Sequence, residues 1–182
     1  MSREEEILTA ATKLFAERSF DGTGVDALAK EAGITGSAIY RYFSSKDEVL
    51  AALFDRLIDA LLIRVGDPAP DPDEELRHLI GIHVEYVLDN PELTIIWQRE
   101  QAALTGDHHR RFSRRQRTYI DRWIQALDAR YPGHPRDQLA ATVRAIHGLI
   151  SSDTSRPRTV RRIKDLPAQL CAMAEGACTA LA

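Results

Sequence analysis

The stretch that decides the fold is TGVDALAKEAGITGSAIYRYFSSK, residues 23–46. It predicts two short helices, the first capped by Thr23 and closed at Gly33, the second running from about Thr35 to Phe43. The alanines at positions 29 and 32 let the helices cross closely, and the glycine at 33 permits a sharp turn between them. The predicted motif is a helix-turn-helix, which presents its second helix at an angle to the first.

The second of these helices carries short polar side chains and one long cation on its outer face. Such a helix can enter a DNA major groove, where Arg41 can donate two hydrogen bonds to a guanine edge. Tyr42 and Lys46 follow as groups that can reach the phosphate backbone. The alternative is a plain corner between two helices, a common arrangement that binds nothing. On the first interpretation, the groove-facing residues are Thr35, Gly36, Ser37, Tyr40 and Arg41.

Charge supports the nucleic-acid interpretation locally and not globally. The whole chain has 24 basic and 27 acidic residues, so its net charge is −3. The protein therefore lacks the overall positive charge that would attract a polyanion such as DNA. From Ala32 to Lys46, however, the only charged residues are Arg41 and Lys46, both positive. A phosphate-facing surface needs such a segment, whereas a solvated face usually mixes both signs. With 44% hydrophobic and 28% charged residues, the composition excludes an intrinsically disordered chain.

Outside this stretch, apolar residues keep the spacing of amphipathic helices, and no run alternates convincingly as a half-buried strand does. Ser2 with Glu5, and Ser45 with Glu48, form Ser-x-x-Glu capping boxes that predict the starts of two helices. Residues 67–73 hold three prolines and predict a loop. The fold class is therefore predicted to be all-α with about nine helices. The later helices are expected between residues 74 and 89, 91 and 105, and 107 and 130, and near 136–152 and 163–181.

Four segments carry a family resemblance: EILTAATKLFAE (6–17), FDGTGV (20–25), LAKEAGIT (28–35) and IYRYFSSKDEVL (39–50). Together they resemble the N-terminal signature of the TetR family of bacterial transcriptional regulators, over about residues 3–53. The resemblance implies a helix-turn-helix DNA-binding domain over 1–46 and an effector-binding and dimerisation domain over 47–182. It also implies a homodimer that binds a palindromic operator, usually as a repressor, and is released by a small-molecule effector.

The same resemblance assigns roles to single residues. It places Thr35, Gly36, Ser37 and Arg41 on the recognition surface, and it assigns DNA-backbone contacts to Tyr40, Tyr42 and Lys46, with Thr23 also among the DNA-binding residues. Two departures from the family pattern affect this assignment. Gly24 stands where many members have a hydroxyl, which removes a phosphate contact. Ser37 stands where many have glycine, which changes the groove-facing surface and leaves the operator sequence open.

Effector candidates past residue 53 are polar or aromatic residues on or beside apolar helix faces. A polar group buried there needs a partner, which either a ligand or another side chain can supply. Aromatic rings at helical spacing can wall a pocket or simply fill the core. The candidates are His83, Tyr86, Trp97, Glu100, Tyr119, Trp123 and His147. Five arginines between His108 and Arg117 are either a solvated helix start or a clamp for an anionic effector such as an acyl-CoA.

The last two predicted helices carry apolar stripes and small alanines, which predict a four-helix bundle across a two-fold axis. A dimer of this kind would place two recognition helices about one DNA turn, ~34 Å, apart. The predicted interface residues are Leu139, Val143, Ile146, Ile150, Leu166, Leu170, Met173 and Ala177.

Enzyme chemistry is not expected, because the glycine-rich, nucleophile-elbow and His-Glu-x-x-His motifs are missing from the sequence. The six histidines show no metal-ligand spacing, so neither metal nor cofactor is expected. Cys171 and Cys178 are too far apart on one helix to bridge. Without a signal-peptide pattern or an apolar span, we expect a cytoplasmic protein with no membrane partner.

The alternatives to a ligand-released repressor are an activator and a helical small-molecule-binding protein that does not bind DNA.

Overall fold

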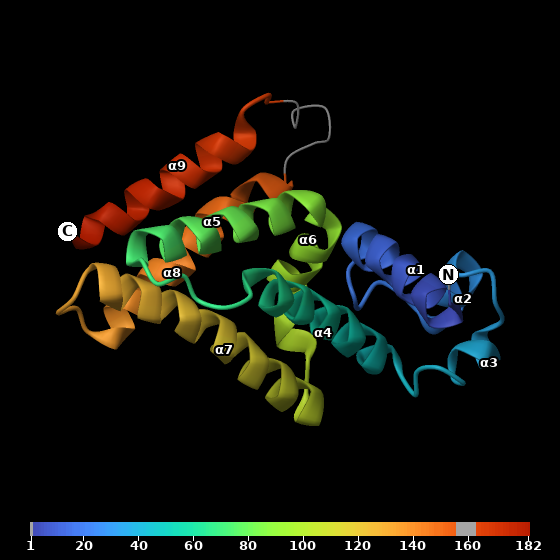
Figure 1. Cartoon of the computed structure of the whole chain (residues 1–182). Coiled ribbons are helices and arrows are strands. Elements are labelled where there is room, and N and C mark those ends of the chain that lie inside the picture. Colours follow the sequence, from blue (N-terminus) through green and yellow to red (C-terminus); the bar gives the residue numbers. More distant parts are fainter. Residues whose placement is uncertain (1, 156–162) are drawn as a thin grey trace. The chain divides into compact units, whose positions relative to one another are not determined.

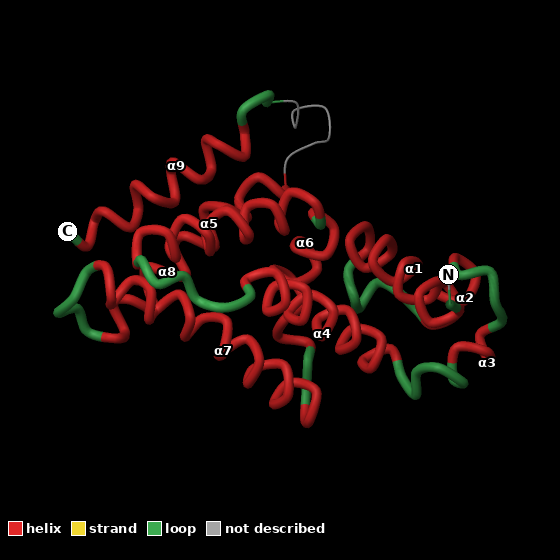
Figure 2. The backbone as a smooth tube through the Cα atoms, viewed as in Figure 1, coloured by secondary structure: helices red, strands yellow, loops and turns green. Residues whose placement is uncertain are grey.

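The computed structural model describes residues 2–155 and 163–182, and these residues form helices and loops, with no strand among them (Figure 2). The prediction of an all-α protein is confirmed. The helices are α1 (Arg3–Arg18), α2 (Val25–Glu31), α3 (Gly36–Ile39), α4 (Lys46–Val65), α5 (Pro72–Asp89), α6 (Pro91–Glu100), α7 (Gly106–Arg130), α8 (Arg136–Ser151) and α9 (Leu166–Cys178). Short 3₁₀ turns follow α6, α8 and α9, at Gln101–Ala103, Ser152–Ser155 and Thr179–Leu181.

The chain packs into two compact units, whose helices are drawn in Figure 1. The first unit holds Met1–Ile58 and Glu92–Arg114, and the second holds Asp59–Pro91 and Arg115–Ala182. Helices α4 and α7 therefore contribute residues to both units. This grouping by contact is not the same as the predicted functional division into 1–46 and 47–182, which stays a prediction.

Local signals start α1 and end α2 as predicted. The Ser2 hydroxyl accepts a hydrogen bond from the Glu5 amide at 3.2 Å, and the Glu5 carboxylate accepts one from the Ser2 amide at 2.7 Å. This is the predicted capping box. After α2, Gly33 adopts a φ of +68°, a left-handed conformation that glycine adopts without strain. The apolar stripe of α1 is buried in the first unit.

Helix α2 begins differently from the prediction. Its N-cap is Gly24, which offers no side-chain cap, so the assignment of this cap to Thr23 is wrong. The Thr23 hydroxyl instead donates to the main-chain oxygen of Ser19 at 2.8 Å, and the side chain is buried. This hydrogen bond stabilises the loop after α1, in which Ser19 has a φ of +72°. The Thr23 hydroxyl is therefore not available to cap the start of α2.

Helices α3 and α4 are also adjusted at their ends. Helix α3 stops at Ile39, and tighter i→i+3 bonds from the Arg41 and Tyr42 amides continue the turn that was expected to be helical as far as Phe43. At the start of α4, the Ser45 hydroxyl accepts from the Glu48 amide at 3.2 Å, as predicted. The Glu48 carboxylate, however, accepts from the amide and hydroxyl of Ser44, so the reciprocal half of the expected capping box is shifted by one residue.

In the second unit, α9 packs on α5 and α8, and α5 also packs on α8 (Figure 1). Six of the eight residues predicted for a dimer interface lie in this intrachain core, each at most 7% exposed: Leu139, Val143, Ile146, Ile150, Leu166 and Leu170. Met173 is 50% exposed and Ala177 is half-buried. These six residues thus hold the chain's own helices together, while Met173 and Ala177 stay accessible to a partner.

A buried ion pair fixes the end of α4 in the second unit. The Arg122 guanidinium of α7 donates to Glu75 of α5 and to the main-chain oxygen of Gly66, the latter at 2.6 Å. The other carboxylate oxygen of Glu75 accepts from the Ala69 amide at 2.8 Å, which holds the proline-rich loop. Burial opposes ionisation of Glu75, but the hydrogen bonds from Arg122 and Ala69 outweigh it and keep the pKa of Glu75 below its ordinary value.

Candidate nucleic-acid interface and ligand site

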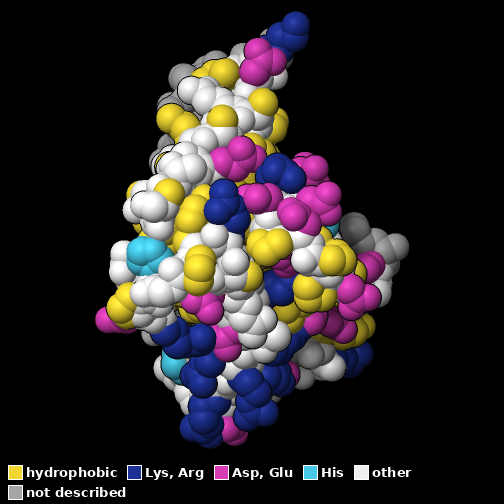
Figure 3. All heavy atoms as spheres, turned by 60° about the vertical axis from the view of Figure 1, so that its left-hand side comes forward, with side chains coloured by type: hydrophobic (Ala, Val, Ile, Leu, Met, Phe, Trp, Pro, Cys, Tyr) yellow, Lys and Arg dark blue, Asp and Glu magenta, His cyan; other side chains and the backbone are white. Residues whose placement is uncertain are grey.

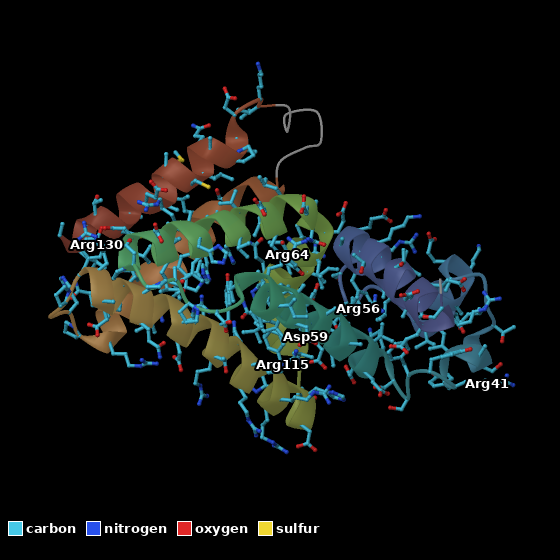
Figure 4. The ribbon with its side chains drawn as sticks, viewed as in Figure 1. Arg41, Arg56, Asp59, Arg64, Arg115 and Arg130 are labelled. Atoms are coloured by element: carbon cyan, nitrogen blue, oxygen red, sulfur yellow. The ribbon has the colours of Figure 1, made fainter. Side chains whose placement is uncertain are left out.

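The outer surface around α3 is exposed, as the groove-facing interpretation requires. Tyr40 is 58% exposed and Tyr42 45%, both large values for aromatic side chains. Arg41 is exposed and extends outward in Figure 4. The hydroxyls of Thr35 and Ser37 are exposed and lie 3.2 Å apart. The structure thus brings five of the predicted DNA-binding residues onto one exposed segment.

Gly36 lies beside the Asp26 side chain of α2, a neighbour that the sequence pattern does not show. A Cβ atom at this position would lie 2.7 Å from a carboxylate oxygen of Asp26 in α2. Because this oxygen ends an exposed side chain, a Cβ atom at position 36 would require only that the Asp26 side chain move. The same contact brings the exposed Asp26 beside the start of α3, so the segment without acids in the sequence has an acidic neighbour in space.

Two predicted site residues, Lys46 and Glu100, both form hydrogen bonds with the main chain of Phe20 in the first unit. Lys46 was predicted to contact a DNA phosphate, and Glu100 was predicted to contact the effector. Lys46 Nζ donates to the main-chain oxygen of Phe20 at 2.7 Å and lies 4.1 Å from the centre of its ring. The Glu100 carboxylate accepts from the Phe20 amide at 3.1 Å. The neighbouring Arg99 donates to the main-chain oxygen of Phe15 at the end of α1, at 2.5 Å. Phe20 was missed because its role lies in its main chain, which the sequence pattern does not report.

In the second unit, four of the predicted effector residues come together in what we call the four-ring cluster: His83 of α5, Tyr119 and Trp123 of α7, and His147 of α8. The two imidazoles stack with centroids 4.0 Å apart, and His147 meets Trp123 edge-on at 4.8 Å. His83 Nδ1 and the Tyr119 hydroxyl share a hydrogen bond of 3.0 Å. The three residues other than His147 are at most 7% exposed.

Burial keeps the four-ring cluster uncharged. It lowers the pKa of His83 to about 4, because a charged imidazole would lose its hydration there. Burial and the adjacent His83 hold the pKa of His147 well below its ordinary value. Burial also raises the pKa of Tyr119, although Trp123 acts in the opposite direction. At neutral pH the cluster is therefore a set of neutral polar rings inside an apolar core.

The other predicted effector residues lie elsewhere. Trp97 packs in the first unit against Phe54 and Phe112, with ring centroids 5.1 and 4.8 Å away. Tyr86 is buried in the second unit under the Arg64 guanidinium, and burial raises its pKa to about 12 against the effect of that cation. Within the second unit, the four-ring cluster joins four of the five effector candidates, and Tyr86 is the fifth.

The arginine run of α7 is partly engaged in ion pairs. Basic side chains gather at the bottom of Figure 3, where α7 begins. Arg110 pairs with Asp107, and Arg111 pairs with Asp55 of α4 at 2.7 Å. In the second unit Arg115 pairs with Asp59, and the two side chains face each other in Figure 4. These carboxylates already neutralise three of the arginines that an anionic effector would need.

The described part of the chain contains no group of three or more acidic, histidine or cysteine side chains placed to hold a metal ion. Within the same residues, no helix combines the length and the apolar character that crossing a bilayer requires.

Comparisons with known proteins place the chain in a family. Residues 7–53 match the model described as "Bacterial regulatory proteins, tetR family", and residues 69–152 match that of the tetracyclin repressor-like C-terminal domain. The chain belongs to the TetR family. The predicted family resemblance is thus confirmed, and it extends into the C-terminal part, where the sequence pattern alone gave no more than long helices.

Curated relatives are regulators. The chain is 29% identical to the HTH-type transcriptional regulator HbdR of Aromatoleum over 108 residues, 58% of this chain and 47% of that protein. It is 32% identical to the repressor KstR2 of Mycobacterium tuberculosis over 108 residues, 58% of this chain and 54% of that protein. The match thus spans about half the length of these relatives.

Solved structures show the same fold. KstR2 of Mycobacterium tuberculosis superposes with a TM-score of 0.82 at 22% identity, covering 98% of this chain and 94% of that one. AibR, solved in complex with isovaleryl coenzyme A and operator DNA, gives 0.79 at 23% identity, covering 94% and 97%.

Proposed function

We propose that the protein is a transcriptional regulator that binds operator DNA through the exposed segment around α3. The observation that carries the proposal is the joint exposure of Thr35, Ser37, Tyr40, Arg41 and Tyr42 on one short surface, in a chain of the TetR family. A protruding helix with hydroxyls and a guanidinium can read base edges, while the tyrosines reach phosphates. Regulation of transcription, and not catalysis, is what this surface supports, and its site of action would be the cytoplasm.

The finer proposal is a repressor released by a small-molecule effector. Two relatives support it: KstR2 is a repressor, and AibR was solved with both isovaleryl coenzyme A and operator DNA bound. Release follows if the effector binds more tightly to the DNA-incompetent state. The test is selection of genomic DNA fragments by the purified protein, followed by footprinting. Recovery of one palindromic sequence is expected, and recovery of random fragments would contradict operator binding.

Replacing Arg41 with alanine is expected to relax base preference at one operator position and to cost roughly 1–3 kcal/mol of specific binding, the value of a bidentate guanine contact. The measurement is titration of the selected operator and of a random duplex by fluorescence anisotropy. Arg56→Ala, which removes an exposed arginine from α4 of the same unit, is the matched control and should bind like the wild type. Equal losses on both duplexes for Arg41→Ala would make it a phosphate contact instead.

We further propose a homodimer through the exposed faces of α8 and α9, in place of the buried stripes. Small residues recur on these faces at helical spacing, with Ala141, Ala145 and Gly148 on α8, and Ala172 and Gly176 on α9. Such faces let helices of two chains approach closely. Met173 is exposed beside them and would supply apolar area. Two-fold pairing through these helices would give the two recognition helices that a palindrome requires.

The dimer proposal predicts the result of replacing Gly176 with glutamate. A Cβ there meets nothing within 4 Å in the single chain, so the fold should be retained, while two like charges would enter the interface. The dimer dissociation constant, measured by analytical ultracentrifugation, should rise at least about tenfold. Gly81→Glu on α5 is the matched control, because a Cβ at Gly81 is equally unobstructed. If both variants stay as dimeric as the wild type, the interface lies elsewhere.

A further inference from the structure

The four-ring cluster leaves hydrogen-bonding capacity unused inside the second unit. No described residue offers a hydrogen-bond partner to His147 Nε2 or Trp123 Nε1, and both atoms are buried. Trp123 Nε1 lies near the Tyr119 hydroxyl without completing a hydrogen bond to it. A buried donor left unmatched costs about 1–3 kcal/mol, and such groups in folded proteins generally have a partner. Apolar rings of similar size would fill this core without that cost.

We propose that the four-ring cluster is the polar end of the effector site and receives the neutral carbonyl oxygen of an otherwise apolar ligand, such as a ketone, an ester or a thioester. The inference rests on the proposed function and names the chemical class of the effector. The two unmatched nitrogens belong to neighbouring rings, whose centroids lie 4.8 Å apart, and the proposal requires that one ligand oxygen reach both of them.

Trp123 Nε1 and His147 Nε2 would both bind a hydrogen-bond acceptor on the ligand. The indole Nε1–H of Trp123 can only donate, so its partner must carry a lone pair. His147 Nε2 donates as well in the tautomer that carries its proton there. A carbonyl oxygen has two lone pairs and can accept from both rings. The surrounding helices α5, α7 and α8 contribute buried aliphatic residues, including Val84, Leu127 and Val143, which suit the apolar remainder of the ligand.

The charge state of the cluster argues against a carboxylate in this place. Its four rings are neutral at physiological pH, because burial disfavours both imidazolium ions. A buried carboxylate without a counter-charge is strongly unfavourable, whereas a neutral carbonyl carries no such penalty. The site should therefore bind a neutral carbonyl compound more tightly than the carboxylate of the same chain length.

The test uses straight-chain methyl ketones and the carboxylates of matching length as probes of the full-length protein. The sequence has two tryptophans, so the Trp97→Phe variant leaves Trp123 as the sole indole. Its fluorescence should change saturably with at least one ketone and not with the matching carboxylate. In this background, His147→Phe should weaken ketone binding about tenfold, the loss of one hydrogen bond. His147→Gln keeps an N–H donor and should recover part of the affinity.

His109→Phe, which changes an exposed histidine at the start of α7, is the matched control and should bind as the wild type does. The proposal is overturned if no ketone in the series perturbs Trp123, if the carboxylate binds as tightly, or if His147→Phe binds as before. An unfolded His147→Phe variant leaves the ketone–carboxylate comparison decisive. Selection of operator DNA is measured without any ligand, so failure of this inference and failure of the regulator proposal give different results.

Discussion

Replacing Arg122 with leucine is expected to lower the free energy of unfolding by roughly 3–5 kcal/mol, because it leaves the Glu75 carboxylate charged and buried without its partner. The Glu75 side chain is 6% exposed and that of Arg122 is 14% exposed, so water screens neither group well. The loss also frees the Gly66 main-chain oxygen at the end of α4. Urea denaturation followed by circular dichroism at neutral pH measures the change.

An exposed ion pair between the same two helices is the control. Arg130 of α7 pairs with Asp73 of α5 at 2.6 Å, with side chains 42% and 52% exposed. Arg130→Leu should cost no more than about 1 kcal/mol, since exposed pairs contribute little. In the double variant Glu75→Leu, Arg122→Leu, much of the stability should return, because no unpaired charge remains. Equal losses for Arg122→Leu and Arg130→Leu would contradict this account of the buried pair.

Lowering the pH from about 6.5 to about 4 is expected to remove up to roughly 3 kcal/mol of stability through His83. Its pKa in the folded protein is about 4, against 6.5 when exposed, so in this window the unfolded chain binds the additional proton. Stability from this group is therefore complete above pH 6.5 and is lost as the pH falls. His147, whose pKa is also lowered, acts in the same direction.

Urea denaturation at several pH values and one protein concentration provides the measurement. The variant His83→Phe, His147→Phe should show a flatter dependence of the unfolding free energy on pH above about 4.5. Glu75 contributes mainly below this range, because its pKa is lowered from 4.5. The control variant His109→Phe should show the same dependence of the unfolding free energy on pH as the wild type. That result would show that the exposed His109 does not cause the loss of stability at low pH. A slope unchanged in the double variant would mean that the buried imidazoles are not responsible.

Sequence reasoning succeeded where the determinants are local. The capping box of Ser2 and Glu5 lies within one helical turn, and the turn glycine at 33 needs only its own backbone conformation. It failed where a side chain had a choice of distant partners. The Thr23 hydroxyl bonds to Ser19 and Lys46 to Phe20, and neither choice is visible in helical periodicity.

The apolar stripes of α8 and α9 show a second limit. Periodicity identified the correct apolar faces, but it could not tell whether the chain's own helices or a partner would cover them. For the effector candidates, the stripes indicated His83 and His147 one by one. Their stacking at 4.0 Å across α5 and α8 depends on how the helices pack, which is a tertiary property.

The bonds at Phe20 also bear on how this protein can be recombined with its relatives. A chimera that takes residues 1–46 from this chain would carry Phe20 and Lys46 together, but it would leave Arg99 and Glu100 behind. The amide of Phe20 and the last carbonyls of α1 would then meet whatever the recipient has at the end of its own α6. The segments that must be transferred together are therefore not contiguous in the sequence. A functional chimera must include the last turn of α6, with Arg99 and Glu100, as well as residues 1–46.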